Sequence, residues 1–158
     1  MQPSVSVVIP VLNEERFLAQ SVNAILNQNY DGQIEVILAL GPSIDNTNQV
    51  AQDLAKDNRV KLIQNPTGKT AAALNNAIKN SKFEIIVRLD GHAIVDENYV
   101  KNAIESLNQT NADNVGGLMK AEGISDFEKS VAAAMTSDRK STRLNSSHIP
   151  LSRMPSSA

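Results

Sequence analysis

The sequence has 158 residues, of which 41% are hydrophobic and 3% are aromatic, and its formal net charge is −2. These values suit a single globular domain with a real core. They argue against a nucleic-acid-binding protein, which would be basic or rich in stacking aromatic residues. The absence of cysteine excludes a disulfide framework and a thiolate metal site.

The first predicted elements are a strand and a helix. Residues 4–10 form a short β-branched run, which predicts a strand that ends at its proline. Apolar residues three and four apart predict a helix over residues 13–28. Asn13 is its expected cap, and Glu14 and Glu15 fall in the first turn, where the helix dipole favours negative charge.

The next elements continue the alternation. Residues 34–40 form a continuous apolar run, which is typical of a buried strand. Residues 47–57 carry an apolar stripe at helical spacing, and Asp45 can cap that helix or bind a ligand. Residues 60–65 predict a third strand, and residues 70–79 predict a third helix.

The second half of the chain repeats the pattern. Residues 83–90 predict a fourth strand, and residues 97–108 predict a fourth helix. Residues 113–119 predict a fifth strand, and residues 125–137 begin a final helix. Strand and helix alternate throughout, which predicts an α/β, Rossmann-like fold. Its sheet would be mostly parallel, with right-handed crossovers and helices on both faces.

The ends of the predicted strands share a chemical character. In a parallel sheet of this kind the ligand lies beyond the carboxyl ends of the strands. These ends are polar or glycine-rich at residues 10–14, 41–45, 65–70 and 90–92. We therefore expect four loops to converge on one binding site.

Asp90, Gly91 and His92 directly follow the fourth predicted strand. In an extended segment, side chains two residues apart can point to the same side, and glycine lets the backbone turn and a ligand approach. A carboxylate with an imidazole suits Mn²⁺ or Mg²⁺, with phosphate oxygens and water completing the shell. The alternative is a plain turn, since Asp-Gly is a frequent turn dipeptide.

Two cationic residues lie near the same edge. The stretch TGKT is similar to part of a P-loop, but Ile63 stands where a P-loop needs glycine, so no P-loop nucleotidase is expected. Lys69, at a helix N-terminus, can attract a diphosphate or be a plain solvated lysine. Arg88 within a strand must be paired, with Asp90 or with a bound phosphate, unless it faces solvent at an edge.

Composition changes sharply after Ser137. Residues 138–158 lack a helical or strand period and are rich in serine, arginine and proline, which predicts disorder. The stretch DRKSTRLNSSH also fits one translated frame of a common sequencing-library adapter. We therefore interpret residues 138–158 as an artefact joined to a truncated gene, with no functional role for His148. Residues 1–137 are then the functional domain, and we expect it to be incomplete.

The ordered motifs resemble those of the family 2 glycosyltransferases of the GT-A type. VSVVIPVLNEE is similar to the family's first strand and nucleotide loop, and GKTAAALNNAI to its Gly-x-x-x-Ala-x-Asn helix. VRLDGHA stands in the place of the Asp-x-Asp metal motif. The GPS and Asp-x-His patterns are most similar to the succinoglycan-biosynthesis subgroup. The resemblance covers residues 5–137.

The resemblance implies a nucleotide-sugar donor and a divalent metal cofactor, Mn²⁺ or Mg²⁺. Asp90 and His92 would hold the metal. Pro10, Leu12 and Glu14 would lie near the nucleoside. Lys69 would lie near the diphosphate. The residues expected to bind the nucleotide are, in full, Pro10, Leu12, Asn13, Glu14, Gly41, Asp45, Lys69 and Arg88.

Two positions depart from the family pattern. Leu40 or Gly41 stands where the family usually has a base-recognising aspartate, so recognition of uracil is not implied. His92 replaces the second aspartate of the metal motif and lowers the charge of the ligand set by one. The catalytic base would lie beyond Ser137, so we expect this chain to bind nucleotide weakly and not to turn over.

The expected function is transfer of a sugar from a nucleotide-sugar donor to an acceptor hydroxyl with inversion, in polysaccharide or glycoconjugate synthesis. The acceptor would be a saccharide or a lipid-linked saccharide, and no nucleic-acid partner is expected. One alternative is a nucleotidyltransferase, although VIPVLNEE lacks the glycine-rich signature that this class would show. The other is a non-catalytic nucleotide-binding or remnant module.

The cellular location follows from the same sequence. MQPSVSVVIP lacks the basic region of a signal peptide, and no apolar run approaches the roughly 20 residues of a membrane span. We expect a cytoplasmic protein, which would lie at the inner face of the membrane in its full-length form. Membrane association would come only through a missing C-terminal part.

Overall fold

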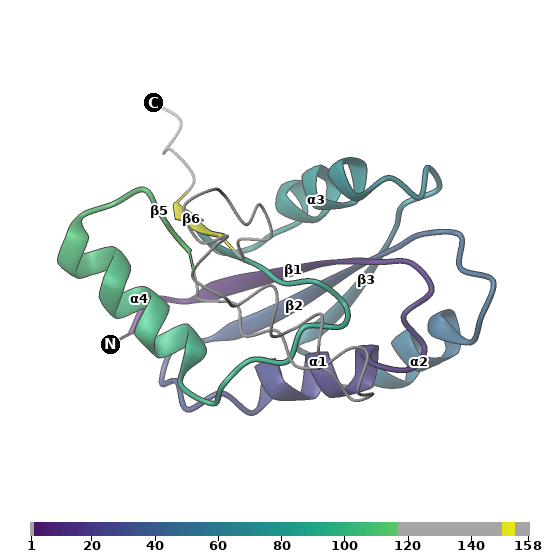
Figure 1. Ribbon diagram of the computed structural model, residues 1–158, viewed down its shortest axis with the longest axis horizontal. Helices are drawn as coiled ribbons and strands as arrows, with labels where there is room; N and C mark the ends of the chain where they lie inside the picture. The colour runs from purple at the N-terminus through teal and green to yellow at the C-terminus, as the bar shows by residue number, and fades with distance from the viewer. Residues whose placement is uncertain (1, 117–149, 154–158) are drawn as a thin grey trace, which may run out of the picture.

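A computed structural model describes residues 2–116 and 150–153 of the chain, with side chains for the first of these ranges (Figure 1). Strands and helices alternate over most of it, as predicted. In chain order the elements are β1 (Val5–Val11), α1 (Leu18–Leu26), β2 (Ile34–Leu40), α2 (Thr47–Leu54), β3 (Val60–Gln64), α3 (Thr70–Lys79), β4 (Ile85–Arg88), α4 (Tyr99–Thr110), β5 (Asn114–Gly116) and β6 (Pro150–Arg153).

The strands form one sheet in the order β3-β2-β1-β4-β6-β5. The first four are parallel: β1 pairs with β2 on one side and with β4 on the other, and β2 pairs with β3. β6 runs antiparallel to both β4 and β5. The prediction of a Rossmann-like, mostly parallel sheet is therefore confirmed.

Helices cover both faces of the sheet, as predicted. α3 lies above the sheet in Figure 1, and α1 and α2 lie below it. Successive strand residues alternate between the faces, so Val7 and Ile9 pack in the core below, with α1, α2 and α4. Val8 and Ile37 pack in the smaller core on the face that α3 covers. Burial on both faces explains why the central strands are continuously apolar.

β1 begins and ends one residue later than predicted, because Pro10 does not end it. The N–H of Val5 donates to Gln33 and the carbonyl of Val11 accepts from Gly41, so the odd-numbered residues of β1 bond toward β2. The ring nitrogen of Pro10 therefore faces the side of β4, which has already ended at Arg88. A proline there removes no hydrogen bond from the ladder.

α1 begins at Leu18, later than predicted, and Asn13 does not cap it. Asn13 has a φ of +56°, in the left-handed region, and its side-chain oxygen accepts the N–H of Ile44 instead. The chain then turns, with the N–H groups of Phe17 and Leu18 donating to the carbonyl of Glu14. The predicted first-turn position of Glu14 and Glu15 is therefore also wrong, since the helix proper has no acidic residue in its first turn.

The remaining boundaries differ by a few residues, except at β2 and α3, where the predicted and observed ends coincide. The predicted fourth strand, residues 83–90, is shorter in the structure, and the predicted fourth helix, residues 97–108, begins and ends two residues later. The helix predicted over residues 125–137 lies outside the described residues. None of the helices in the described ranges is long and apolar enough to span a bilayer.

The C-terminal segment predicted to be disordered, residues 138–158, contributes β6 to the sheet. The prediction of disorder is therefore wrong for Pro150–Arg153. Without β6, the edge of β4 that faces away from β1 would present unpaired backbone groups, with which an extended segment can pair whatever its side chains. The adapter origin of residues 138–158, and the domain boundary at Ser137, stay predictions.

Candidate functional site

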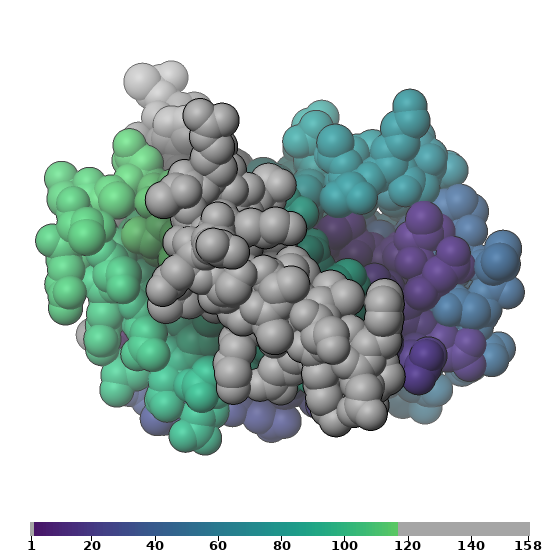
Figure 2. Space-filling view, viewed as in Figure 1, coloured from purple at the N-terminus to yellow at the C-terminus, as the bar shows by residue number. Residues whose placement is uncertain are grey.

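A pocket of about 370 Å³ opens at the carboxyl ends of the strands. In the space-filling view the purple residues that follow β1 reach the surface beside the teal of α3 and the blue segment around α2 (Figure 2). This is the edge at which the four loops were predicted to converge. The pocket is lined by Pro10, Val11, Leu12, Glu14, Asn65, Gly68, Thr70, Ala73, Arg88, Asp90, Gly91 and His92.

Arg88 and Asp90 form an ion pair at the end of β4. Nη2 of Arg88 lies 3.3 Å from Oδ1 of Asp90, and each side chain is about one-third exposed (32% and 34%). Asp90 is thus the partner that Arg88 was predicted to need. Both side chains line the pocket, so an anionic ligand there would meet the guanidinium and a cation would meet the carboxylate.

The backbone at Asp90 is held from two sides. Its carbonyl accepts the N–H of Ala93 at 2.9 Å, which closes a tight turn over Gly91 and His92. The hydroxyl of Ser21, which is buried in α1, donates to the same carbonyl at 3.3 Å. The Asp-Gly turn that was the alternative interpretation is therefore real, and it also orients two pocket side chains.

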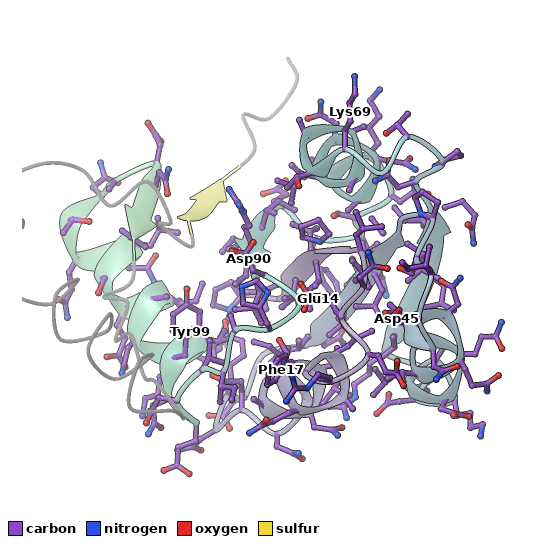
Figure 3. All side chains as sticks on the ribbon, turned by 45° about the vertical axis from the view of Figure 1, so that its right-hand side comes forward. Glu14, Phe17, Asp45, Lys69, Asp90 and Tyr99 are labelled. Carbon is purple, nitrogen blue, oxygen red and sulfur yellow. The ribbon has the colours of Figure 1, made fainter. Side chains whose placement is uncertain are left out.

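Glu14 and His92 connect the loop after β1 with the loop after β4. Nδ1 of His92 lies 2.9 Å from Oε1 of Glu14, and Figure 3 shows Glu14 near Asp90. The Glu14 side chain is 17% exposed and the imidazole is 62% exposed. Gly91 leaves room for this contact, because a Cβ at that position would lie 2.9 Å from Cγ of Glu14. Within residues 2–116, Nε2 of His92 has no hydrogen-bond partner, and His92 lines the pocket.

The loops after β1 and β2 are joined by reciprocal hydrogen bonds. The N–H of Asn13 donates to Oγ of Ser43 at 3.0 Å, and Oδ1 of Asn13 accepts the N–H of Ile44 at 2.9 Å. The positive φ of Asn13 places both groups toward the same neighbouring loop. Asparagine tolerates this conformation better than most residues.

Thr47 is the centre of the same junction and is fully buried. Its hydroxyl accepts the N–H of Glu14 at 2.8 Å and donates to Oδ1 of Asp45. Asp45 also accepts the N–H of Thr47 at 3.0 Å and that of Glu15 at 3.3 Å. These hydrogen bonds, above all that from the Thr47 hydroxyl, hold the pKa of Asp45 below its usual value. Asp45 therefore satisfies a free donor at the start of α2, as predicted, although Asn46 occupies the cap position itself.

The loop between β3 and α3 also lines the pocket. Oγ1 of Thr67 donates to Oδ1 of Asn65 at 2.8 Å, and Nδ2 of Asn65 donates to the carbonyl of Lys69 at 3.2 Å. Gly68 has a φ of +64° and lines the pocket. Lys69 is exposed and does not line it; Figure 3 shows Lys69 at the far side of α3 from Asp90 and Glu14.

The predicted site residues therefore divide into two groups. Those that line the pocket are Pro10, Leu12, Glu14, Arg88, Asp90 and His92, and those that do not are Asn13, Gly41, Asp45 and Lys69. Asn13 and Asp45 instead join the surrounding loops. Asn65 and Thr70 were not predicted as site residues, although their place directly after β3 and at the start of α3 could have indicated them.

The donor set fits a divalent cation that arrives with its own ligands. Asp90 and His92 offer a carboxylate oxygen and an imidazole nitrogen, which suit Mn²⁺. The part of the chain that the structure describes contains no group of three or more acidic or histidine side chains placed to hold a metal. A cation between Asp90 and His92 would need phosphate and water oxygens to complete its shell.

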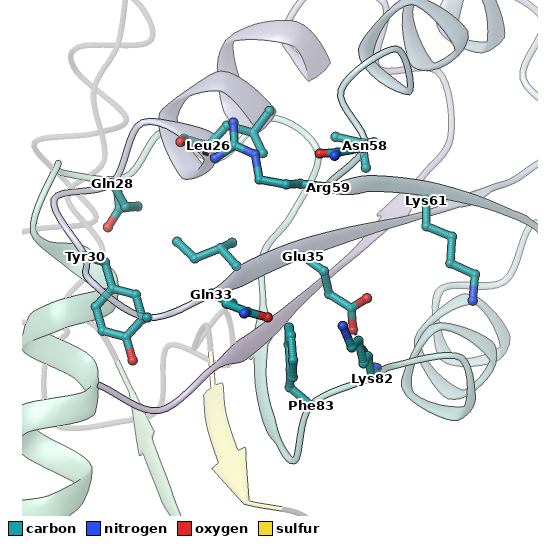
Figure 4. Close-up of a pocket in the computed structure, with 13 residues that line it drawn as sticks. Leu26, Gln28, Tyr30, Gln33, Glu35, Asn58, Arg59, Lys61, Lys82 and Phe83 are labelled. Carbon is teal, nitrogen blue, oxygen red and sulfur yellow. Dashed lines mark hydrogen bonds between the residues drawn. The ribbon is translucent and has the colours of Figure 1, made fainter. Parts of the chain in front are cut away.

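A larger cavity, of about 690 Å³, lies at the opposite end of the sheet, near the amino ends of β2 and β3 (Figure 4). Glu35 and Arg59, two of its charged side chains, already have hydrogen-bond or ion-pair partners within the chain. Oε1 of Glu35 accepts the hydroxyl of Ser6 at 2.5 Å and the N–H of Lys82 at 2.6 Å. Arg59 pairs with Asp57 at 2.8 Å. Despite its size, this cavity lacks the converging loops of the smaller pocket, where we place the candidate site.

Comparisons with known proteins identify the family of the chain. A model of the family described as Glycosyl transferase family 2 matches residues 6–154. The chain is 31% identical over 134 residues to the succinoglycan biosynthesis protein ExoA of Rhizobium meliloti, which covers 83% of this chain and 41% of that protein.

Solved structures share the fold. The mannosyltransferase PcManGT from Pyrobaculum calidifontis, in complex with GDP-Man and Mn²⁺, is 24% identical with a TM-score of 0.68, over 77% of this chain and 37% of that one. TarS 1–349 of S. aureus, in complex with UDP, is 20% identical with a TM-score of 0.65, over 78% and 38%. The chain thus spans about two fifths of the length of each of these three proteins.

Proposed function

This chain belongs to glycosyl transferase family 2, and on that premise we propose that its pocket binds a nucleoside diphosphate sugar. The full-length protein would transfer the sugar to an acceptor hydroxyl with inversion at the anomeric carbon. One observation carries the proposal: a pocket at the carboxyl ends of parallel strands, lined by the Arg88–Asp90 pair and by His92. Ligands of such sheets bind at this edge.

Two features of the pocket would bind the diphosphate. The guanidinium of Arg88 would donate charge-assisted hydrogen bonds to phosphate oxygens. The amino end of α3, where Thr70 lines the pocket, presents backbone N–H groups and the positive end of a helix dipole. Pro10 and Leu12 line the adjoining surface and would contact the nucleoside.

Asp90 and His92 would hold a divalent cation, Mn²⁺ or Mg²⁺. When bound, that cation supplies positive charge that neutralises the departing nucleoside diphosphate. PcManGT, which shares the fold, has Mn²⁺ in its complex. The protein's own part would be to hold the diphosphate against the Arg88 guanidinium and the amino end of α3, so that the acceptor approaches from the face opposite the leaving group.

The acceptor hydroxyl needs a general base, which we place beyond Ser137. This chain alone would then bind nucleotide without turning over. Among its relatives, ExoA is named for succinoglycan biosynthesis, which supports a role in polysaccharide synthesis with a saccharide or lipid-linked acceptor. We place the reaction in the cytoplasm, at the inner face of the membrane in the full-length protein.

Isothermal titration calorimetry with UDP and GDP, each with and without Mn²⁺, tests the proposal. We expect binding of at least one nucleotide, strengthened by Mn²⁺, and a loss of about tenfold or more of the Mn²⁺-dependent affinity in Asp90→Asn. Asp31→Asn is the matched control, because Asp31 is an exposed aspartate that precedes β2 at the other end of the sheet. If neither nucleotide binds with Mn²⁺ present, the proposal is wrong and the chain is a non-binding remnant.

A further inference from the structure

We infer that Glu14 is a positioning residue that fixes the imidazole of His92 with its proton on Nδ1, so that the lone pair of Nε2 faces the pocket. The inference rests on the proposed function for the identity of what Nε2 meets there. It assigns Glu14 a role different from nucleoside contact. The observation behind it is the 2.9 Å distance between Nδ1 of His92 and Oε1 of Glu14.

The chemistry of the two groups decides which way the hydrogen bond runs. An ionised carboxylate has no proton to give and can only accept. Nδ1 of His92 must therefore be the donor in this contact. In a neutral imidazole one nitrogen carries the proton and the other carries a lone pair, so a proton on Nδ1 leaves Nε2 as an acceptor or metal ligand.

Glu14 is held firmly enough to impose this choice. Its N–H is bonded to the buried Thr47, and its carbonyl accepts the N–H groups of Phe17 and Leu18. Its side chain is mostly buried and lies against Gly91, where a Cβ would come within 2.9 Å of Cγ. The imidazole is the more mobile partner, because most of it is exposed. The carboxylate therefore orients the ring, and not the reverse.

The tautomer determines what the pocket can bind. With the proton on Nδ1, Nε2 can coordinate a cation, which needs a lone pair. With the proton on Nε2, the ring offers the pocket a donor that suits a phosphate oxygen but not a metal. Carboxylates that accept the second N–H of a metal-binding histidine typically raise metal affinity by 10–100-fold. Glu14 stands in that relation to His92.

Nitrogen-15 NMR of histidine-labelled protein measures the tautomer directly. The chain has two histidines, His92 and His148, so a His92→Gln spectrum assigns the signals. At about pH 8.5, where histidine side chains are neutral, we expect long-range ¹H–¹⁵N correlations to show His92 as the Nδ1–H form. Glu14→Ala should shift it toward the Nε2–H form. Glu84→Ala, at an exposed site before β4, should not.

A second readout separates this inference from the proposed function. In the wild type, Mn²⁺ with UDP or GDP should broaden the His92 signals, and Glu14→Ala should raise the Mn²⁺ concentration needed by about tenfold. If Glu14→Ala does not fold, Gly91→Ala displaces the same carboxylate while keeping it in the chain.

The outcomes are distinct. A wild-type His92 in the Nε2–H form, or an unchanged tautomer in Glu14→Ala, overturns the role of Glu14. If Glu14→Ala needs the same Mn²⁺ concentration as the wild type, Glu14 does not position His92 for metal binding. A tautomer that responds as expected, while Mn²⁺ leaves wild-type His92 unbroadened, supports Glu14's control of the ring and contradicts the metal site of the proposed function.

Discussion

The buried hydroxyl of Thr47 accepts the backbone N–H of Glu14 at 2.8 Å, so the first residue of α2 holds the loop that follows β1. The same hydroxyl donates to Asp45. One side chain thereby fixes the position from which Glu14 reaches His92. The pocket depends on this junction although Thr47 does not line it.

Thr47→Val should destabilise the fold by about 1–3 kcal/mol, because it leaves the Glu14 N–H without its partner at nearly constant side-chain volume. Urea unfolding followed by circular dichroism measures the change. Thr110→Val is the control. The Thr110 hydroxyl donates to the Ser106 carbonyl at the exposed end of α4, so removing it should change the unfolding free energy by no more than about 0.5 kcal/mol. Equal losses in the two variants would contradict the role given to Thr47.

Arg88→Ala should weaken metal-free binding of UDP or GDP by about tenfold, because it removes a charge-assisted hydrogen-bond donor from the pocket. Titration in the presence of EDTA isolates this effect from that of a cation. Lys101→Ala, which removes an exposed charge on α4, should leave the affinity unchanged. Undiminished binding by Arg88→Ala would show that the guanidinium serves Asp90 alone.

Gly68→Ala should destabilise the protein by about 1–2 kcal/mol, because a Cβ is strained at a φ of +64°. Gly68→Asn should cost less, since asparagine enters the left-handed region more readily. Thermal unfolding compares them with Gly116→Ala in β5, a described glycine without a positive φ. If alanine and asparagine at position 68 proved equally stable, strain would not be the cause.

Asp57 should contribute to acid unfolding. Hydrogen bonds from Arg59 lower the pKa of Asp57 from 3.8 to about 2. Because the folded-state pKa lies below the unfolded value, this stabilisation is complete above about pH 4 and is lost as the pH falls toward 2. Urea unfolding at several pH values should show that the unfolding free energy of Asp57→Asn falls less over this pH range than that of the wild type.

Arg59→Ala should also reduce this pH dependence. The double variant, Asp57→Asn with Arg59→Ala, should reduce it no further than Asp57→Asn does alone. A double variant whose slope falls by the sum of the two single effects would mean that the pair does not act as a unit. High salt should weaken the effect only in part, because hydrogen bonds contribute more than charge attraction to the lowered pKa.

The regular elements could be predicted from local pattern. β2 and α3 have their predicted ends, because a continuous apolar run and an alanine-rich helix are each bounded by loops rich in polar residues and glycine. The start of α1 could not be predicted. The left-handed conformation of Asn13 is set by Ser43 and Ile44, about thirty residues later in the chain.

The site shows the same division. The Arg88–Asp90 pair was predictable, because a charge next to a buried strand needs a partner and a carboxylate is two residues away. The contact between Glu14 and His92 was not, since it joins residues 78 positions apart that local periodicity does not relate. Lys69 shows the opposite case: its motif suggested a ligand contact, but the side chain is exposed away from the pocket.

The central place of β1 has a consequence for how the chain acquires its structure. β1 precedes the other described strands, yet Val5 pairs with Ile34 on one side and with Ile85 on the other. During synthesis, one edge of this very apolar strand stays without its native neighbour until β4 has left the ribosome. Such long-range pairing slows folding and favours association of nascent chains, so the same strand that supports the pocket is the one most dependent on protection before the sheet is complete.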